Sequence, residues 1–404
     1  MGVQDVCKEI TTLEKNNNIE AFFALLRAGL WEDVMVNGEG FMVNGSPLTI
    51  SDGVDWNKVL DLAEEQSVVG LLAAGIEVVQ GSWFKVHGAP LVPKPMALQF
   101  VGRTVQLEQR NQAMNYFIGV LVEKMREAGI YTLLVKGQGV AQCYERPMRR
   151  AGGDIDLFLS DDNYEKAKAF LTPLAASVEE EYVREKHMGM SIDSWVVELH
   201  GRLYSGLSSR IEKELDNVYR DSFHQGDVRV WDNNGVQVFQ LSVENDAFYV
   251  FTHILQHFFK EGVGLRQICD WCRLLWKHRE SLNTTKLESR VRRAGLLSEW
   301  KAFAAYAVEW LGMPADAMPM YDSSDKWIKK AKNNNRFILS VGNMGHNRDM
   351  SHFSKYPYLI RKCVSMGRRT SDLINHARIF PLDSLRFFPR IMWNGVKSAV
   401  RGEG

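Results

Sequence analysis

The sequence predicts an α+β fold, in which a small mixed sheet with helices is flanked by helical regions on both sides. Four short runs are typical of strands: 131–135, 154–159, 181–192 and 195–199. Before residue 130 and after about residue 240, the apolar residues recur instead at helical spacing. We therefore expect three parts: an N-terminal helical region (1–95), a core with a long leading helix (96–240) and a C-terminal helical domain (241–404).

The helices are predicted by periodicity and by their end signals. In the N-terminal region, Asn18 to Leu30 and Trp56 to Val79 read as helices on either side of a glycine-rich stretch at 37–53. Pro90, Pro93 and Pro95 mark a break before the leading helix. That helix is expected over Leu98 to Ala128, and Gly129 is a fitting stop.

Composition excludes several classes of protein. The chain has 404 residues, of which 45% are hydrophobic and 24% charged, which fits neither a disordered chain nor a fibre. Lys plus Arg (49) equals Asp plus Glu (49), so overall charge gives no argument for nucleic-acid binding. There is no apolar run long enough for a membrane span and no secretory-type N-terminus. Five cysteines, an odd number, argue against a disulfide framework, so we expect a cytoplasmic protein.

The chemistry begins with Asp154 and Asp156. They are two residues apart in a strand-like run, so both side chains project from the same face of the sheet. Two carboxylates held this close repel each other, and a divalent cation relieves the repulsion. Hard oxygen ligands favour Mg²⁺ or Mn²⁺.

Three neighbouring features strengthen this interpretation. Gly153, with Gly152 before it, leaves room for a bulky anion at the start of the strand. Upstream, another strand ends in Lys136-Gly137-Gln138-Gly139, a turn whose backbone N–H groups suit phosphate oxygens. A later strand carries Glu198. Three carboxylates facing a phosphate-binding turn predict a two-metal site for phosphoryl transfer.

Several motifs resemble the uncharacterised nucleotidyltransferase family, within the DNA polymerase β-like nucleotidyltransferase superfamily. The most specific part is 134–157, and the likeness extends over roughly 55–350. The motifs that carry it are Leu134-Val135-Lys136-Gly137, Tyr144-Glu145-Arg146-Pro147-Met148-Arg149-Arg150, Gly153-Asp154-Ile155-Asp156-Leu157, Glu198-Leu199-His200-Gly201-Arg202-Leu203, His253-Ile254-Leu255-Gln256-His257, Leu265-Arg266-Gln267-Ile268-Cys269-Asp270 and Gly342-Asn343-Met344-Gly345-His346-Asn347-Arg348.

The resemblance implies metal-dependent transfer of a nucleoside monophosphate from an NTP, most simply ATP, to an acceptor hydroxyl, with release of pyrophosphate. On this hypothesis Asp154 and Asp156 coordinate both ions, and Glu198 completes the ion that activates the nucleophile. The turn from Lys136 to Gly139 holds the β- and γ-phosphates. Arg149 and Arg150 are candidates for the triphosphate, although a solvated loop explains one of them equally well. His200 is either a substrate contact or a structural histidine.

Two alternatives to an active nucleotidyltransferase stay open. The superfamily commonly has Gly-Ser or Gly-Gly after the first strand and Asp as the third acid, whereas this chain has Gln138 and Glu198. An inactive nucleotide-binding or regulatory module of the same fold is therefore the first alternative. A metal-dependent glycosyltransferase is the second, but it does not account for the Lys136 turn and the Glu198 strand together.

Two further patterns invite other functions. Cys269 and Cys272, with His253 and His257, have the residue types of a tetrahedral zinc site, but packed helical residues explain them more simply. The stretch from Arg361 to Arg401 is basic, with interleaved aromatic residues that suit RNA or an anionic membrane surface, but a partner-docking or simply solvated tail is the default interpretation. Pro381 and Pro389 predict that no long helix forms there.

Overall fold

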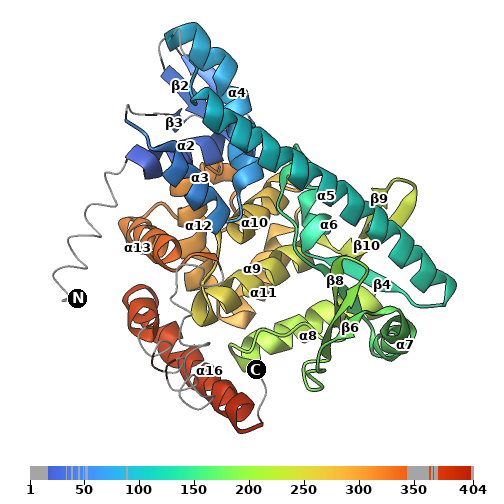
Figure 1. The fold of residues 1–404 in the computed structure, drawn as a ribbon. Helices are drawn as coiled ribbons and strands as arrows, with labels where there is room; N and C mark the ends of the chain where they lie inside the picture. Colours follow the sequence, from blue (N-terminus) through green and yellow to red (C-terminus); the bar gives the residue numbers. More distant parts are fainter. Residues whose placement is uncertain are drawn as a thin grey trace.

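The structure is a computed structural model that describes residues 17–32, 34–37, 40–43, 46–48, 50, 53–87, 90–343, 364, 367 and 372–401 (Figure 1). Its helices are α2 (Asn17–Trp31), α3 (Trp56–Glu65), α4 (Val69–His87), α5 (Lys94–Glu127), α6 (Gly137–Ala141), α7 (Asp161–Leu171), α8 (Ser209–His224), α9 (Val243–Lys260), α10 (Leu265–Lys277), α11 (Thr284–Ala294), α12 (Leu297–Leu311), α13 (Asp325–Val341) and α16 (Pro381–Arg401).

The strands form two sheets. A small antiparallel sheet contains β1 (Val34–Asn37), β2 (Gly40–Val43) and β3 (Ser46–Leu48). The larger sheet has the order β6-β7-β8-β5-β4-β10-β9 and mixes parallel with antiparallel pairs. Its strands are β4 (Thr132–Val135), β5 (Ile155–Leu159), β6 (Ser177–Val178), β7 (His187–Ile192), β8 (Trp195–His200), β9 (Val228–Asn233) and β10 (Val236–Leu241). A mixed sheet flanked by helices agrees with the predicted α+β class.

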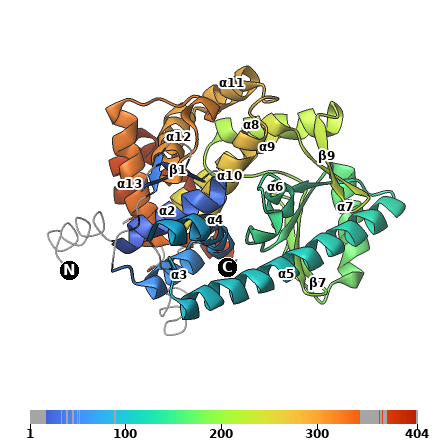
Figure 2. The same cartoon turned by 90° about the horizontal axis from the view of Figure 1, so that it is seen from above.

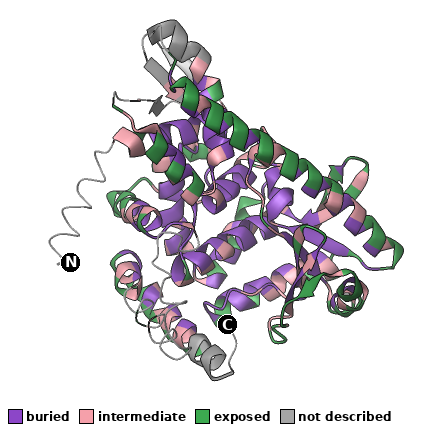
Figure 3. Cartoon of the chain, viewed as in Figure 1, coloured by how far each residue is buried: buried purple, intermediate pink, exposed green. Residues whose placement is uncertain are grey.

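The long leading helix is confirmed and covers one face of the large sheet. Helix α5 runs for 34 residues and has a proline in its first turn, where the absent N–H costs nothing. Gly129 follows it in the left-handed region (φ 69°). Figure 2 shows α5 passing along the sheet while the C-terminal helices gather on the other side of the molecule. The exposed outer face of α5 is visible in Figure 3.

Strand β5 is buried on both faces, and its alternation sets the direction of the acids. Ile155, Leu157 and Leu159 pack with α5 and α7 in one hydrophobic cluster. Phe158 belongs to the other cluster, which includes the C-terminal helices. Because side chains alternate along a strand, Asp156 shares the face of Phe158. The acidic face of the sheet therefore looks toward α9 and α10.

Several elements differ from the sequence prediction. The single helix expected over Trp56 to Val79 is two helices, α3 and α4, because Ser67 between them adopts a positive φ of 57°. The glycine-rich stretch contains the small sheet. Strands β9 and β10 form a hairpin on the edge of the core, and Asn234 and Gly235 make its turn with φ of 55° and 91°.

The N- and C-terminal helical regions share a single hydrophobic cluster. Helices α2 and α4 touch backbone to backbone, since a Cβ on Gly29 would lie 1.8 Å from the Leu71 carbonyl oxygen. The Trp31 indole N–H donates to the Leu311 carbonyl at 2.6 Å, which joins α2 to α12. The boundaries 1–95, 96–240 and 241–404 stay a prediction.

The prediction that no long helix forms in the C-terminal stretch was wrong. Helix α16 starts at Pro381 and continues through Pro389 to Arg401. Pro381 stands in the first turn, where it is tolerated. Phe380 and Phe387 are fully buried against the aromatic side chains of α9, while Trp393 is 61% exposed. Arg361, Lys362, Arg368 and Arg369 lie outside the described residues. Within the described residues, no helix combines the length and apolar character needed to cross a membrane.

Candidate functional site

The three predicted acids meet on one face of the large sheet. Asp154 immediately precedes β5, Asp156 lies on β5, and Glu198 lies on β8. Strands β5 and β8 are parallel, with Asp156 opposite Glu198. One carboxylate oxygen from each of the three lies within 4.8 Å of the others. The sheet register thus places these acids together, although Asp156 and Glu198 are 42 positions apart along the chain.

Two basic side chains accompany the buried acid. Asp156 is only 1% exposed, and its Oδ1 lies 2.8 Å from Lys136 Nζ. The same oxygen lies 2.8 Å from His200 Nε2. Desolvation of a carboxylate is costly without such partners. The Lys136 and His200 contacts therefore explain how Asp156 stays buried and ionised.

The backbone at the end of β4 aims Lys136 at the acids. Lys136 has φ 55° and ψ −147°, a conformation that non-glycine residues rarely adopt, and Gly137 follows with φ 45°. A Cβ on Gly137 would lie 3.4 Å from the Asp154 carbonyl oxygen. This turn is therefore packed directly against the start of β5.

Two histidines contact Glu198. His187, on β7, places Nε2 3.2 Å from Glu198 Oε2, and His200 Nε2 lies 3.5 Å from the same oxygen. The two imidazole rings stand 4.8 Å apart between centroids. His187 was not predicted. A sequence signal could have identified it, because the two-residue turn Asp193-Ser194 joins β7 to β8. In a hairpin with this turn, the residues at equal distances from it are paired, and His187 therefore lies opposite His200.

The pKa values of the three acids are shifted in different directions. The neighbouring Asp156 charge, together with burial, raises the pKa of Asp154 above its usual value. Burial opposes ionisation of Asp156, but Lys136 and His200 outweigh it and lower the pKa of Asp156. Burial is likewise outweighed at Glu198, where His187 and His200 lower the pKa. Lys136 and His200 thus supply the positive charge, and His187 a hydrogen bond to Glu198, that hold Asp156 and Glu198 ionised.

The glycines of the two predicted phosphate-binding segments differ in how much free space lies beside them. A Cβ on Gly153 would meet nothing within 4 Å, so there is open space beside the acids. Gly139 and Gly152 are crowded by side chains. The Gln138 side chain is 1% exposed and donates from Nε2 to Asn111 Oδ1 of α5 at 2.9 Å. Gln138 therefore fastens α6 to α5 rather than facing the acids.

Arg149 and Arg150 are already engaged within the chain. Arg149 pairs with Glu77 and Glu108, each at 2.8 Å. Arg150 makes two parallel bonds to Asp270 of α10, at 2.6 Å from Nη2 and 3.1 Å from Nε. Such a bidentate, buried pair ties the loop before β5 to the C-terminal helices.

Two residues near the acids were missed as candidates. Arg266 of α10 donates from Nη1 to the Ala151 carbonyl at 3.1 Å, and its charge offsets part of the rise in the pKa of Asp154. Tyr249 of α9 faces Lys136, whose ammonium lies 5.8 Å from the ring centroid. Burial raises the pKa of Tyr249 to about 12 despite this neighbouring positive charge. Tyr249 carries no local signal, and Arg266 stands in the Leu265–Asp270 motif without any indication of its neighbours. Helix packing brings both residues here.

The zinc alternative receives little support from the packing. Cys269 and Cys272 are buried in α10 and free, and His253 and His257 contact each other at 3.0 Å. Over the described part of the chain, the groups whose geometry suits a metal are Asp154–Asp156–Glu198 and His187–Glu198–His200. The cysteines belong to neither group.

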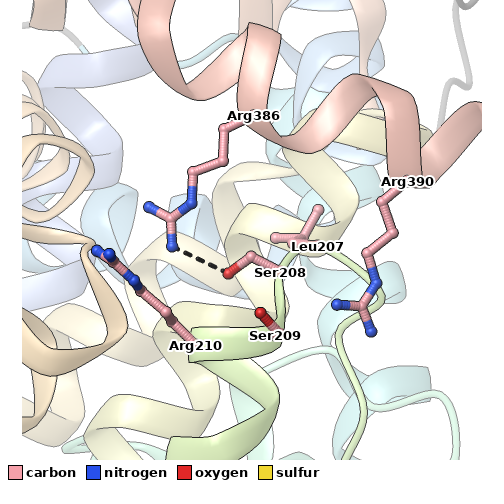
Figure 4. A pocket seen from close by; sticks show the side chains of 6 residues that line it. All are labelled: Leu207, Ser208, Ser209, Arg210, Arg386 and Arg390. Carbon is pink, nitrogen blue, oxygen red and sulfur yellow. Dashed lines mark hydrogen bonds between the residues drawn. The ribbon is translucent and has the colours of Figure 1, made fainter.

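A separate cavity of about 410 Å³ lies where α16 meets the start of α8. Figure 4 shows three arginines around it: Arg210, Arg386 and Arg390. Arg386 donates to Ser208 Oγ at 3.1 Å and to the carbonyls of Ala294 (3.1 Å) and Gly295 (3.2 Å). Part of the basic C-terminal stretch thus packs against the chain itself.

The carboxylate site fits a hard divalent cation. Asp154, Asp156 and Glu198 offer oxygen donors close enough to share an ion, and the space beside Gly153 is open. The fold and this site together define an α+β protein whose sheet carries an acidic site able to hold a metal ion.

Residues 52–312 match the family described as uncharacterised nucleotidyltransferases, and the match covers more than half of the chain. The chain therefore belongs to this family. No curated protein and no solved structure matches it. Membership agrees with the resemblance found in the sequence and supports the general class of NTP-using transferases.

Proposed function

We propose that the chain is an active, metal-dependent nucleotidyltransferase with a polymerase β-like core. It transfers a nucleoside monophosphate from an NTP, most simply ATP, to an acceptor hydroxyl and releases pyrophosphate. The observation that carries this proposal is the meeting of Asp154, Asp156 and Glu198 within 4.8 Å, in a chain of the nucleotidyltransferase family.

Each residue of the site has a proposed role. Asp154, Asp156 and Glu198 hold Mg²⁺ or Mn²⁺, which when bound lowers the barrier by neutralising phosphate charge and activating the acceptor hydroxyl. Lys136 and the turn to Gly139 bind the β- and γ-phosphates, and Gly153 leaves room for them. His200 orients Asp156 through its 2.8 Å contact.

The arginines take different parts in this proposal. Arg150 positions the loop before β5 through Asp270, and Arg149 does so through Glu77 and Glu108. Arg266 is a stronger candidate for a phosphate contact, since its charge already acts on Asp154.

The free, buried cysteines accord with a cytoplasmic location. Docking of a partner or an anionic surface stays a proposal for the basic C-terminal stretch.

The test is turnover of an α-³²P-labelled NTP with Mg²⁺ or Mn²⁺, over a pool of candidate acceptors. Asp156→Asn keeps the shape of the side chain and removes its charge, so labelled product is expected to fall by about a hundredfold or more. Asp316→Asn, an exposed position far along the chain, is the matched control. Equal turnover in Asp156→Asn and the native chain would refute the assignment.

One observation favours the alternative of an inactive nucleotide-binding module. Lys136 Nζ and His200 Nε2 both lie 2.8 Å from Asp156 Oδ1, so they neutralise the acid as a cation would. On this alternative, nucleotide affinity is the same with Mg²⁺ and with a chelator, and no acceptor pool yields pyrophosphate. Isothermal titration with a non-hydrolysable NTP separates the two proposals.

A further inference from the structure

A second group of ligand-type side chains lies beside the acids. His187, Glu198 and His200 each offer one donor atom within 4.8 Å of the others. Glu198 belongs to this group and to the carboxylate group as well. A carboxylate has two oxygens, so one side chain can serve an ion on each side.

The β7–β8 hairpin fixes this group geometrically. His187 and His200 are directly opposite each other in the antiparallel register. Glu198 is two residues before His200, so it shares the same face of the sheet. The donors thus stand on regular strands and not on loops, which is the arrangement that holds ligands in place.

The distances suit a metal ion. Imidazole nitrogens and carboxylate oxygens bind first-row metals at about 2.0–2.2 Å, which places neighbouring donors roughly 3–3.5 Å apart. His187 Nε2 and His200 Nε2 lie 3.2 and 3.5 Å from Glu198 Oε2. An ion can therefore sit among these atoms with small side-chain movements.

The donor chemistry differs from that of the acids. Two imidazoles and one carboxylate suit transition metals, whereas Mg²⁺ prefers oxygen and water. We propose that His187, Glu198 and His200 form a nitrogen-containing position for a divalent transition-metal ion, adjacent to the carboxylate position and joined to it by Glu198.

Filling this position changes the partner of Asp156. His200 Nε2 lies 2.8 Å from Asp156 Oδ1, and one ring nitrogen cannot both donate a proton and bind a metal. Ligation by Nε2 therefore replaces the His200–Asp156 contact. Asp156 then keeps Lys136 but loses one of the two partners of its Oδ1, which makes that oxygen more available to the ion shared with Asp154. An ion at the histidine position therefore favours binding at the carboxylate position. This coupling rests on the proposed function; occupancy of the histidine position does not.

The experiment is pulsed electron paramagnetic resonance of the full chain loaded with Mn²⁺ as the probe. A directly bound imidazole gives a ¹⁴N coupling that oxygen ligands do not give. We expect this coupling in the native chain, and we expect it to persist with an excess of Mg²⁺. His187→Gln, at a position 26% exposed, should lose the His187 share of the coupling and weaken Mn²⁺ binding about tenfold or more.

His224→Gln, an exposed histidine on α8, is the matched control and should leave the spectrum unchanged. Asp154→Asn should keep the nitrogen coupling, because Asp154 is not in the histidine group. Bound Mn²⁺ without ¹⁴N coupling in the native chain would overturn the proposal, as would an unchanged spectrum in folded His187→Gln. The spectrum does not depend on turnover, so a failure of nucleotidyl transfer is read separately by the labelled-NTP assay.

Discussion

At the scale of single residues, the backbone conformation of Lys136 is unfavourable in free energy, whereas its side-chain ion pair is stabilising. Its positive φ costs on the order of 1–3 kcal/mol in a non-glycine residue. Its ammonium pairs with buried Asp156 at 2.8 Å, and breaking a buried pair by removing one partner costs about 3–5 kcal/mol. The pair therefore outweighs the strain.

Lys136→Gly tests that balance, because it relieves the strain and removes the charge. We expect the free energy of unfolding to fall by about 2 kcal/mol without divalent ions, the difference between the midpoints of the two ranges. Mn²⁺ should restore most of the loss, since a cation replaces the ammonium. Urea unfolding with and without Mn²⁺ gives both values. A variant more stable than the native chain in chelator would show that strain dominates.

Gln138 is one of the two residues that depart from the common superfamily pattern, and its side chain bonds Asn111 of α5. Gln138→Ser is expected to lower the free energy of unfolding by about 1–2 kcal/mol, because buried Asn111 Oδ1 loses its donor. Labelled-NTP turnover should stay within about twofold of the native rate, since the side chain faces α5. A large loss of turnover at unchanged stability would place Gln138 at the phosphates instead.

At the scale of elements, burial in α10 and after α6 determines the chemistry of Cys269, Cys272 and Cys143. Burial raises the pKa of the Cys269 and Cys272 thiols well above the usual value, and that of Cys143 to about 11. The reactive form of cysteine is the thiolate. We expect iodoacetamide at pH 8 to leave all three unlabelled in the folded chain, with the same result after a chelator is added. Peptide mass mapping reads each site, and chelator-dependent labelling of Cys269 and Cys272 would support the zinc alternative.

The elements also show how far the sequence could predict the fold. The α5 helix, β4, β5 and β8 were predictable because their periodicity and end signals are local. The β9–β10 hairpin has a local signal too, Asn234-Gly235 between alternating valines, and was missed. The continuation of helix α16 through Pro389 could not be predicted. The helix is stabilised by burial of Phe380 and Phe387 against α9, which is distant in the sequence.

The same division holds for the site. Asp154, Asp156 and Glu198 were predictable from strand alternation, and parallel pairing of β5 with β8 brings them together. Arg266 and Tyr249 reach the site only through packing of α10 and α9. The engagement of Arg150 by Asp270 is likewise a contact between residues 120 positions apart. Contacts of that range leave no pattern in one sequence.

At the scale of the whole molecule, the Arg150–Asp270 pair joins the sheet to the C-terminal helices. Tyr144 adds a hydrogen bond from its hydroxyl to Asp270 Oδ1 at 2.8 Å. Asp270→Ala should cost about 3–5 kcal/mol, because it leaves Arg150 buried without a partner. Arg150→Met with Asp270→Leu should recover much of that loss. Thermal unfolding of Arg150→Met, of Asp270→Leu and of the double variant measures the coupling, and additive destabilisation by the two single substitutions would contradict it.

The attachment of α16 is the second long-range link, and Arg386 is its polar anchor. The Arg386 guanidinium donates to Ser208, the N-cap of α8 (Figure 4). It also donates to the carbonyls of Ala294 and Gly295 at the end of α11. Phe380 and Phe387 supply the apolar part of the same attachment. Loss of the anchor is therefore expected to loosen α16 without unfolding the body of the chain.

Arg386→Ala tests this by hydrogen exchange with mass spectrometry. Peptides from α16 should exchange about tenfold faster, because three hydrogen bonds worth roughly 0.5–1.5 kcal/mol each are removed and water replaces part of them. Peptides from β5 and β8 should keep their native protection. Arg378→Ala, at an exposed position just before α16, is the matched control for loss of charge and should not change exchange. Native protection of α16 in Arg386→Ala would mean that the phenylalanines alone hold the helix.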